Sequence, residues 1–519
     1  MKFFSKKSIL KKMAGMGILT LLSRCLGIIR ESLLNMFLGS VGAVSDAFLT
    51  AYRLPNSLRK VFAEGALSAA TVPTLVNIVQ TKGKEPVNRL MSLLFLFFES
   101  IIFFICCFMV IKARWVIGLS SPGFSELQVQ HAVPYLQILA PFIFFISTSA
   151  LLAGALQSVR HFFVPAFSPA LLNIVFIFSV LICITNSFPI EYLCVFILLG
   201  GFIQLMLHLI AYKRLGFSFW RIDKEAWQYF IKVLIKFLPC MVSMSIMEVG
   251  LFVDSRFASW LHEGSVSLIY YANRFMGIPL GVFAVSFSTV LLTHFSRVMM
   301  YAPKRLGFYL LEASKLVFWV SIPTALIMGY FSEKIFITLI TKLTSLQAAE
   351  AAVILTVFLS GLFFFSLNKI LLNIYYAKHN TWIPTLVSIG MIGVNIGLDF
   401  AFVNIFQAAG LALATVIAFA FQVVALILLL YKFFGVRLYI KQFFLFVYKF
   451  ILQLFVIFTG MYGIYRLCDY LVRLLPETLR YLFLETIGFW VWVGPLAGLA
   501  FLLIFWTRKL FGVRVYFLD

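Results

Sequence analysis

Long apolar runs alternate with short polar segments along the whole chain. A helix needs about 20 predominantly apolar residues to cross a bilayer. Runs of this length occur at about fourteen places, with ends that periodicity fixes only to within several residues. We expect the spans at 13–37, 43–78, 90–111, 132–156, 163–186, 190–212, 230–257, 265–297, 309–331, 347–376, 382–403, 408–431, 446–470 and 485–507. The pattern therefore predicts an all-α polytopic membrane protein with both termini on one side of the membrane.

Composition and charge support this fold class. The 519 residues are 62% hydrophobic and 12% charged, whereas a soluble domain is about half apolar and a quarter charged. The net charge of +22 could indicate a nucleic-acid partner, but the distribution of Lys and Arg favours another explanation. The loops predicted to face inward hold 24 of these residues and those predicted to face outward hold 8. This bias predicts cytoplasmic termini and no nucleic-acid binding.

The sequence gives little sign of disulfides or of a cleaved leader. The seven cysteines form no CxxC pair and fall mostly within apolar runs, so we interpret them as small apolar fillers. The basic segment 1–12 leads directly into the first apolar run without a small-residue cleavage site. We therefore expect no cleavable signal peptide.

Two segments 221 residues apart resemble each other. Residues 51–63 read AYRLPNSLRKVFA and residues 272–284 read ANRFMGIPLGVFA, with Ala, Arg, Val, Phe and Ala at the same five places. The match relates the second span to the eighth, and parallel six-helix repeats are a known transporter plan with the substrate site between the halves. We expect six-helix lobes at 1–225 and 226–440, related by a pseudo-two-fold axis. A terminal helix pair at 441–519 would follow, with a groove that suits a hydrocarbon tail.

Helix-breaking residues occur at corresponding places in the two copies. Leu54-Pro55-Asn56 is expected to interrupt the second span and Gly277-Ile278-Pro279 the eighth, because proline removes a backbone hydrogen bond. Such breaks are tolerated at bilayer depth where neighbours or water satisfy the freed carbonyl. Paired breaks point to a binding site between the lobes.

Five arginines lie within or beside these apolar runs, where an ionisable side chain costs about 3 kcal/mol or more. They are Arg24, Arg30, Arg53, Arg59 and Arg274. A guanidinium stays charged and its planar fork pairs with phosphate oxygens. If they converge from three helices on a wet cavity, these residues would hold a phosphate or pyrophosphate. The alternative is that their long side chains snorkel to the membrane interface.

Two further sets of polar residues stand out. Glu31, Asp46 and Glu64 either form structural ion pairs or act as a gate whose pairs change partners between two states. Asp254, Asn395, Asp399 and Thr415 offer oxygen ligands that suit a hard cation. An aspartate hydrogen-bonded to its neighbours is the alternative for the second set.

The sequence holds no Gly-rich phosphate loop, no HExxH and no Ser/His/Asp cluster. We therefore expect a transporter rather than an enzyme, with a polytopic glycosyltransferase as the enzymatic alternative.

The motifs SRxxGxxRE at 23–31, SDAF at 45–48 and RLPNxxRxxFAEG at 53–65 resemble the MurJ/MviN family of bacterial lipid II flippases. GSVSxxYYAxR at 264–274 is similar to the same family. The resemblance implies fourteen helices in two six-helix lobes plus a final pair, in the multidrug/oligosaccharidyl-lipid/polysaccharide exporter superfamily. It implies transport of undecaprenyl-pyrophosphate-linked peptidoglycan precursor from the inner to the outer leaflet of the cytoplasmic membrane.

The resemblance also implies roles for individual residues. Arg24, Arg30, Arg59 and Arg274 match the cationic cavity of the family, with Arg53 at a place where Lys or Arg is common. Asp46, Glu64 and Ser267 match positions near the gate or cavity, and Glu31 stands where an acid is usual. A candidate sodium site would comprise Asp254, Asn395, Asp399, the Leu411 carbonyl and Thr415. No other cofactor is expected.

The expected partners are lipid II, membrane lipids and the cell-wall synthesis machinery. The alternatives are a flippase for another lipid-linked oligosaccharide, a cation-coupled drug antiporter of the same superfamily, and a scaffold that does not transport.

Overall fold

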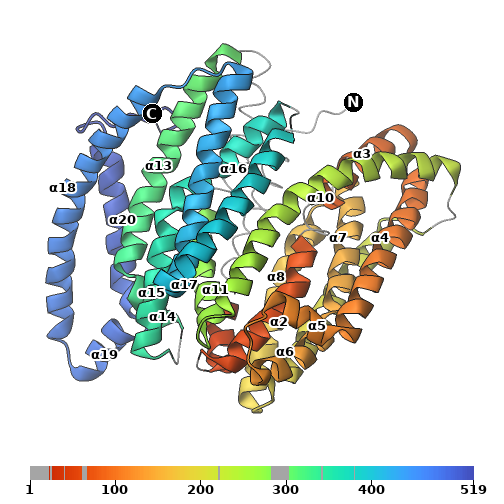
Figure 1. The fold of residues 1–519 in the computed structure, drawn as a ribbon, viewed down its shortest axis with the longest axis horizontal. Coiled ribbons are helices and arrows are strands. Elements are labelled where there is room, and N and C mark those ends of the chain that lie inside the picture. The colour runs from red at the N-terminus through yellow and green to blue at the C-terminus, as the bar shows by residue number, and fades with distance from the viewer. Residues whose placement is uncertain are drawn as a thin grey trace. The chain divides into compact units, whose positions relative to one another are not determined.

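The computed structural model describes residues 23, 26–27, 29–39, 41–60, 67–159, 161–219, 223–281, 298, 303–340, 343–378, 380 and 382–518. Every regular element within these ranges is a helix (Figure 1). Contacts divide the chain into unit 1, Met1–Ser267, and unit 2, Leu268–Asp519. The expected lobes at 1–225 and 226–440 and the terminal pair at 441–519 stay a prediction.

Unit 1 is a bundle of helices that follow the helical segment 29–38. They are α2 (Ala43–Arg59), α3 (Ser68–Lys82), α4 (Glu85–Ile111), α5 (Ala113–Ser120), α6 (Glu126–Leu139), α7 (Phe142–Ser158), α8 (Phe163–Thr185), α9 (Ile190–Arg214) and α10 (Lys224–Ala258). One of its cores lies among α3, α4, α7, α9 and α10 and includes Leu90, Leu94, Leu152 and Tyr212.

A glycine brings α7 and α9 together within this unit. A Cβ at Gly201 would lie 2.8 Å from the Phe142 ring, closer than real Cβ contacts, so the two helices pack at a distance that suits glycine.

Unit 2 begins within α11 (Ser265–Pro279) and continues with a 3₁₀ turn (Pro303–Arg305) and α13 (Leu306–Tyr330). Its remaining helices are α14 (Ser332–Leu339), α15 (Ser345–Ser360), α16 (Leu362–Ala377), α17 (Trp382–Phe434), α18 (Ile440–Arg473), α19 (Glu477–Glu485) and α20 (Phe489–Thr507). One core joins α13, α16 and α17, and another joins α13, α18 and α20. The last segment of the chain folds into the second core, where Val513 and Val515 are fully buried.

Eight described helices are long and apolar enough to cross a membrane, or nine if the bent pair α15 and α16 counts as one span. α17 contains two helices, because Gln407 has φ 50° and ψ −132° and breaks the helical path. The sequence predicts separate spans at 382–403 and 408–431, and this break confirms the division between them. The first expected span, 13–37, lies largely outside the described residues.

The expected interruption at Leu54-Pro55-Asn56 is wrong, because α2 runs through Pro55 and ends at Arg59. A proline removes one hydrogen bond, and the buried Pro55 lies in a helix packed closely against α6. α11 includes Pro279, and residues 280–281 continue it as a π-helical turn at the edge of the described range, so the second break stays a prediction. The offset of 221 residues would carry α2 onto 264–280, which is within one residue of α11 at both ends.

Candidate functional site

The Arg30 guanidinium lies buried in unit 1, between the segment 29–38 and α8. Its Nη1 donates to Oδ1 of Asn173 at 3.0 Å, and its Nη2 lies 2.5 Å from Oε1 of Glu31. The ring of Phe176, one turn further along α8, has its centroid 5.0 Å from Cζ of Arg30. Arg30 and Glu31 are each 8% exposed. Since water hardly reaches the pair, the amide, the carboxylate and the ring together compensate the buried charge.

Asn173 has its amide orientation fixed from both ends. Its Nδ2 donates to the Ser23 carbonyl oxygen at 2.9 Å, and a carbonyl oxygen can only accept. The amide oxygen must therefore face Arg30. Phe176 in turn meets the edge of Tyr52, whose ring stacks on Phe48 of the same helix. Arg30 thus contacts α8 directly, through Asn173 and Phe176, and α2 indirectly, through the ring contact between Phe176 and Tyr52.

The Asp46 carboxylate forms the second buried polar cluster of unit 1. Oδ2 accepts from the Gly264 backbone N–H at 2.7 Å, and Oδ1 accepts from the Ser267 N–H at 2.9 Å and the Ser267 hydroxyl at 2.5 Å. Gln128 of α6 adds a longer contact to Oδ2 at 3.3 Å. Asp46 is 1% exposed.

Gly264 directly precedes α11, and its φ of 96° is one that glycine adopts without strain. Asp46 therefore caps α11 from another helix, where a negative charge is favourable. At the start of α2, the Ser45 hydroxyl accepts from the Gly42 N–H at 2.9 Å and donates to the Gly42 carbonyl oxygen at 2.9 Å. Asp46 and Ser267 stand 221 residues apart, so they occupy equivalent places in the predicted repeat. The contact ties together the first turns of the two related helices.

The other arginines lie in different surroundings. Arg53 donates from Nη2 to the Leu251 carbonyl of α10, and Arg59 donates from Nε to Oδ1 of Asn56 at 3.0 Å. Arg274 belongs to α11 in unit 2 and is exposed. Arg24 and Glu64 lie outside the described residues. The grouping of these arginines in one cavity therefore stays a prediction.

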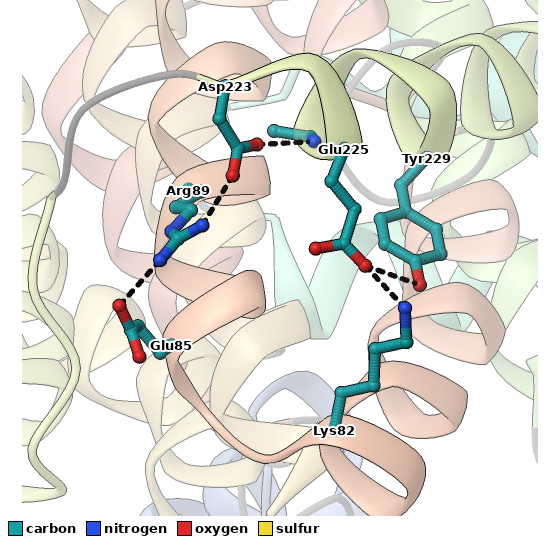
Figure 2. A network of polar contacts seen from close by, with 7 residues as sticks. Lys82, Glu85, Arg89, Asp223, Glu225 and Tyr229 are labelled. Atoms are coloured by element: carbon teal, nitrogen blue, oxygen red, sulfur yellow. Dashed lines mark hydrogen bonds and ion pairs between the residues drawn. The ribbon is translucent and has the colours of Figure 1, made fainter.

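A further polar cluster fixes the start of α10 to α3 and α4 (Figure 2). Nη2 of Arg89 lies 2.6 Å from Oε1 of Glu85, and Nη1 of the same guanidinium pairs with Oδ2 of Asp223. Lys82 pairs with Glu225, whose Oε1 also accepts from the Tyr229 hydroxyl at 3.4 Å. Nearby, Oδ1 of Asn88 accepts from the Ser218 backbone N–H at 3.1 Å. This bond attaches the connection between α9 and α10 to α4.

Hydrogen bonding controls the protonation of this cluster. The Ala226 N–H, and after it Arg89, lower the pKa of Asp223, and Lys82 lowers the pKa of Glu225. The two acids are therefore ionised more readily here than in an unfolded chain. Their contribution to stability is present above the ordinary carboxyl pKa values and is lost as the pH falls through the lowered ones.

The candidate cation ligands divide between the two units. Asp254 lies on α10 in unit 1, and the others lie on α17 in unit 2. Within α17, Asn395 Nδ2 donates to Asp399 Oδ2 at 2.7 Å, and the Thr415 hydroxyl donates to the Leu411 carbonyl at 3.0 Å. Over the described ranges, no three His, Cys, Asp or Glu residues are grouped as metal ligands. The complete oxygen set stays a prediction.

Sequence reasoning missed Asn173, Phe176, Gln128 and Gly264 as parts of these clusters. Asn173 interrupts the apolar helix α8, and a polar residue at membrane depth was the available signal. Its partner Arg30 is 143 positions away, so spacing alone could not reveal the contact. Taken together, unit 1 holds a buried guanidinium paired with a carboxylate and an amide, and a carboxylate that joins α2 to the start of α11.

Comparison with known proteins identifies the family of the chain. The family model described as "Lipid II flippase MurJ" matches residues 34–479. A probable lipid II flippase MurJ of Buchnera aphidicola subsp. Schizaphis graminum is 32% identical over 430 residues, covering 79% of this chain and 81% of the relative. The lipid II flippase MurJ of Burkholderia cenocepacia is 30% identical over 410 residues, covering 76% and 78%.

Solved structures give the same result. A lipid II flippase MurJ in an inward closed conformation superposes with a TM-score of 0.76 and 26% identity, covering 95% of this chain and 99% of that one. An inward-facing multidrug resistance MATE transporter of the MOP superfamily has a TM-score of 0.67 at 16% identity, covering 79% and 92%. The second likeness concerns the fold alone.

We predict that Asn173→Leu lowers the thermal unfolding midpoint of the purified protein, because Arg30 loses an acceptor and the Ser23 carbonyl loses a donor. Leaving such buried groups unsatisfied costs about 1–3 kcal/mol. Asn186→Leu, at the exposed end of the same helix, is the control and should have little effect. The cost of Asn173→Leu should shrink in an Arg30→Met background. An undiminished cost there would show that Asn173 does not act through Arg30.

Proposed function

The chain belongs to the MurJ family of lipid II flippases, and on that premise we propose that it carries lipid II across the cytoplasmic membrane. The cargo is the undecaprenyl-pyrophosphate-linked peptidoglycan precursor, moved from the inner to the outer leaflet for cell-wall synthesis. The Arg30 site carries this proposal. It offers a permanent cation, buried away from water, whose present partners a diphosphate could replace.

Charge balance favours such an exchange. Glu31 and Asn173 each occupy one terminal nitrogen of the Arg30 guanidinium in this state. Diphosphate oxygens can accept from the same nitrogens, and they carry more negative charge than the amide oxygen that they would displace. We propose that Arg24, Arg53, Arg59 and Arg274 complete the cationic surface around the diphosphate. The apolar tail would stay in the lipid, because only the polar headgroup needs an aqueous path.

We propose that the Asp46 contact is the closed state of a gate. Four hydrogen bonds hold this one carboxylate, and three of them come from the first residues of α11 and the glycine before it. Separating α2 from α11 would expose all of these groups at once, so the contact suits an all-or-none switch. The lobes would then rock around the bound headgroup, as in other transporters built from repeats.

The membrane potential supplies direction in this scheme. An inside-negative potential favours outward movement of an anion by about 2.3 kcal/mol per charge per 100 mV. The multi-pass character of the chain follows from its apolar helices. We propose that both termini face the cytoplasm, since the predicted inner loops hold most of the Lys and Arg residues. Transport of this kind requires no catalytic residue in the chain.

We also propose a bound sodium ion that assists the return of the empty carrier. Two carboxylates, an amide, a hydroxyl and a carbonyl are hard oxygen ligands, and such a set fits sodium better than a soft metal. Asp254, Asn395, Asp399, Leu411 and Thr415 would hold it. A bound sodium ion would supply a positive charge near Asp399, which is fully buried.

Sodium binding predicts a thermal shift, because a ligand that binds only the folded state stabilises it. Replacing KCl by NaCl should raise the unfolding midpoint of the wild type but not of Asp399→Asn. Asp469→Asn removes another buried aspartate, which pairs with Arg473 at 2.8 Å, and should keep the sodium response. Equal midpoints in the two salts for the wild type would contradict the sodium proposal and leave the flippase proposal intact.

The direct test of the function is transport by arginine variants in cells depleted of the natural protein. We predict that Arg30→Ala and Arg274→Ala abolish or slow the appearance of lipid II in the outer leaflet by at least about tenfold, since hydrogen bonds to charged groups contribute about 1.5–3 kcal/mol each. Arg114→Ala is the control, because Arg114 is an exposed residue paired with Glu126. All variants must reach the membrane in equal amounts. Normal export by both cavity variants would overturn the proposed role of the arginines.

A further inference from the structure

A cavity of about 230 Å³ lies on the side of α4 near α7. Its lining includes the rings of Phe95, Phe103, Phe104 and Phe144 together with Glu99 and Ser100. Phe103 is 55% exposed and Phe104 is 70% exposed, and on a membrane-spanning helix such exposed rings face lipid. The cavity is therefore accessible to molecules dissolved in the membrane.

Glu99 is the unusual member of this lining. It is the fifteenth residue of the 27-residue helix α4, which places it near the middle of the bilayer. Its residue exposure is 2%. Oε1 accepts from the Ser147 hydroxyl at 2.9 Å, whereas Oε2 has no hydrogen-bond partner among the described residues.

A structural role accounts for only half of this carboxyl group. The bond to Ser147 joins α4 to α7, and a serine or glutamine at position 99 could provide the same link. A buried oxygen left without a partner costs about 1–3 kcal/mol, and an ionisable residue at bilayer depth usually marks a functional site. Glu99 has no role in the transport scheme proposed above, because a carboxylate would repel the anionic headgroup of lipid II.

We infer that this cavity binds a hydrophobic amine dissolved in the membrane. The nitrogen would donate to the Glu99 carboxylate, whose buried Oε2 would turn toward the ligand by rotation of the side chain. The four phenylalanine rings would surround the positive end and the adjoining carbons. Aromatic rings attract ammonium groups through their faces, so the lining suits a cation better than a neutral alcohol. A carboxylate at the same place disfavours fatty acids and phosphates.

Net charge poses no obstacle to this ligand. An ammonium that meets a carboxylate forms a neutral pair joined by an N–H···O bond. A neutral amine that meets a protonated carboxyl also forms a neutral pair, in which the carboxyl O–H donates to the nitrogen. The proton simply lies on nitrogen in one description and on oxygen in the other. The volume corresponds to several water molecules at about 30 Å³ each. It therefore holds the amine and the first carbons of its chain, and the remaining chain extends into the lipid.

Photolabelling in lipid nanodiscs tests the inference. The probe is a decylamine that carries a photoreactive diazirine near the nitrogen, and mass spectrometry locates the attached peptides. We expect labelling of α4 and α7 that unlabelled decylamine suppresses and decanol does not. Glu99→Gln should weaken this labelling at least about tenfold, which corresponds to about 1.4 kcal/mol. Glu85→Gln, an exposed acid in the first turn of the same helix, should label like the wild type.

A second variant guards against a folding defect in Glu99→Gln. Ser100 is exposed on the rim, so Ser100→Phe should fill the cavity without disturbing the core and should also prevent labelling. Labelling of Glu99→Gln at the wild-type level would overturn the inference. So would equal competition by decanol and decylamine, because the site would then select apolar chains rather than amines.

Discussion

A charge buried away from water must be compensated where it lies, and this constraint organises unit 1. Arg30 and Asp46 are both almost completely buried, and each is held by groups from helices distant in sequence. The guanidinium uses a neighbouring carboxylate, an amide and an aromatic ring. The carboxylate uses backbone and side-chain donors from α11 and α6. Leaving either charge uncompensated would cost several kcal/mol.

The same constraint suits these residues to a switching mechanism. A compensated buried charge can exchange one partner for another of the right sign, but it cannot simply be left alone. In the proposed cycle the diphosphate takes over contacts that Glu31 and Asn173 provide at Arg30. α2 gives a physical connection between this exchange and the proposed gate, since it carries Asp46 in its first turn and Tyr52 six residues later. Tyr52 meets Phe176, whose other neighbour is the Arg30 guanidinium.

The sequence predicts the helices well where a polar segment bounds an apolar run. The expected spans 163–186 and 190–212 match α8 and α9 closely, because turns of polar residues and Pro189 separate them. The break at Gln407 also follows from the gap between two apolar runs. The break predicted at Pro55 is wrong. A single proline removes only one hydrogen bond, and the tertiary packing of α2 keeps the helix continuous.

The polar clusters are harder to predict than the helices. Repeat matching relates α2 to α11, and the family motifs include both Asp46 and Ser267, yet neither feature specifies four donors around one carboxylate. The hydrogen bonds at Arg30 depend on Asn173, which lies in an apolar helix with no periodic polar pattern around it. Such contacts depend on how helices rotate and pack against one another, and local sequence contains little information about this.

Cross-linking at the gate tests the central claim most directly. The hydroxyls of Ser45 and Ser267 lie 3.1 Å apart, so cysteines at both places should form a disulfide while Asp46 stays intact. Under oxidation, the Ser45→Cys/Ser267→Cys protein should stop delivering lipid II to the outer leaflet, and a reducing agent should restore delivery. Each single-cysteine protein should transport in both conditions. Normal delivery by a fully cross-linked protein would contradict the account, because α2 and α11 would not need to separate during transport.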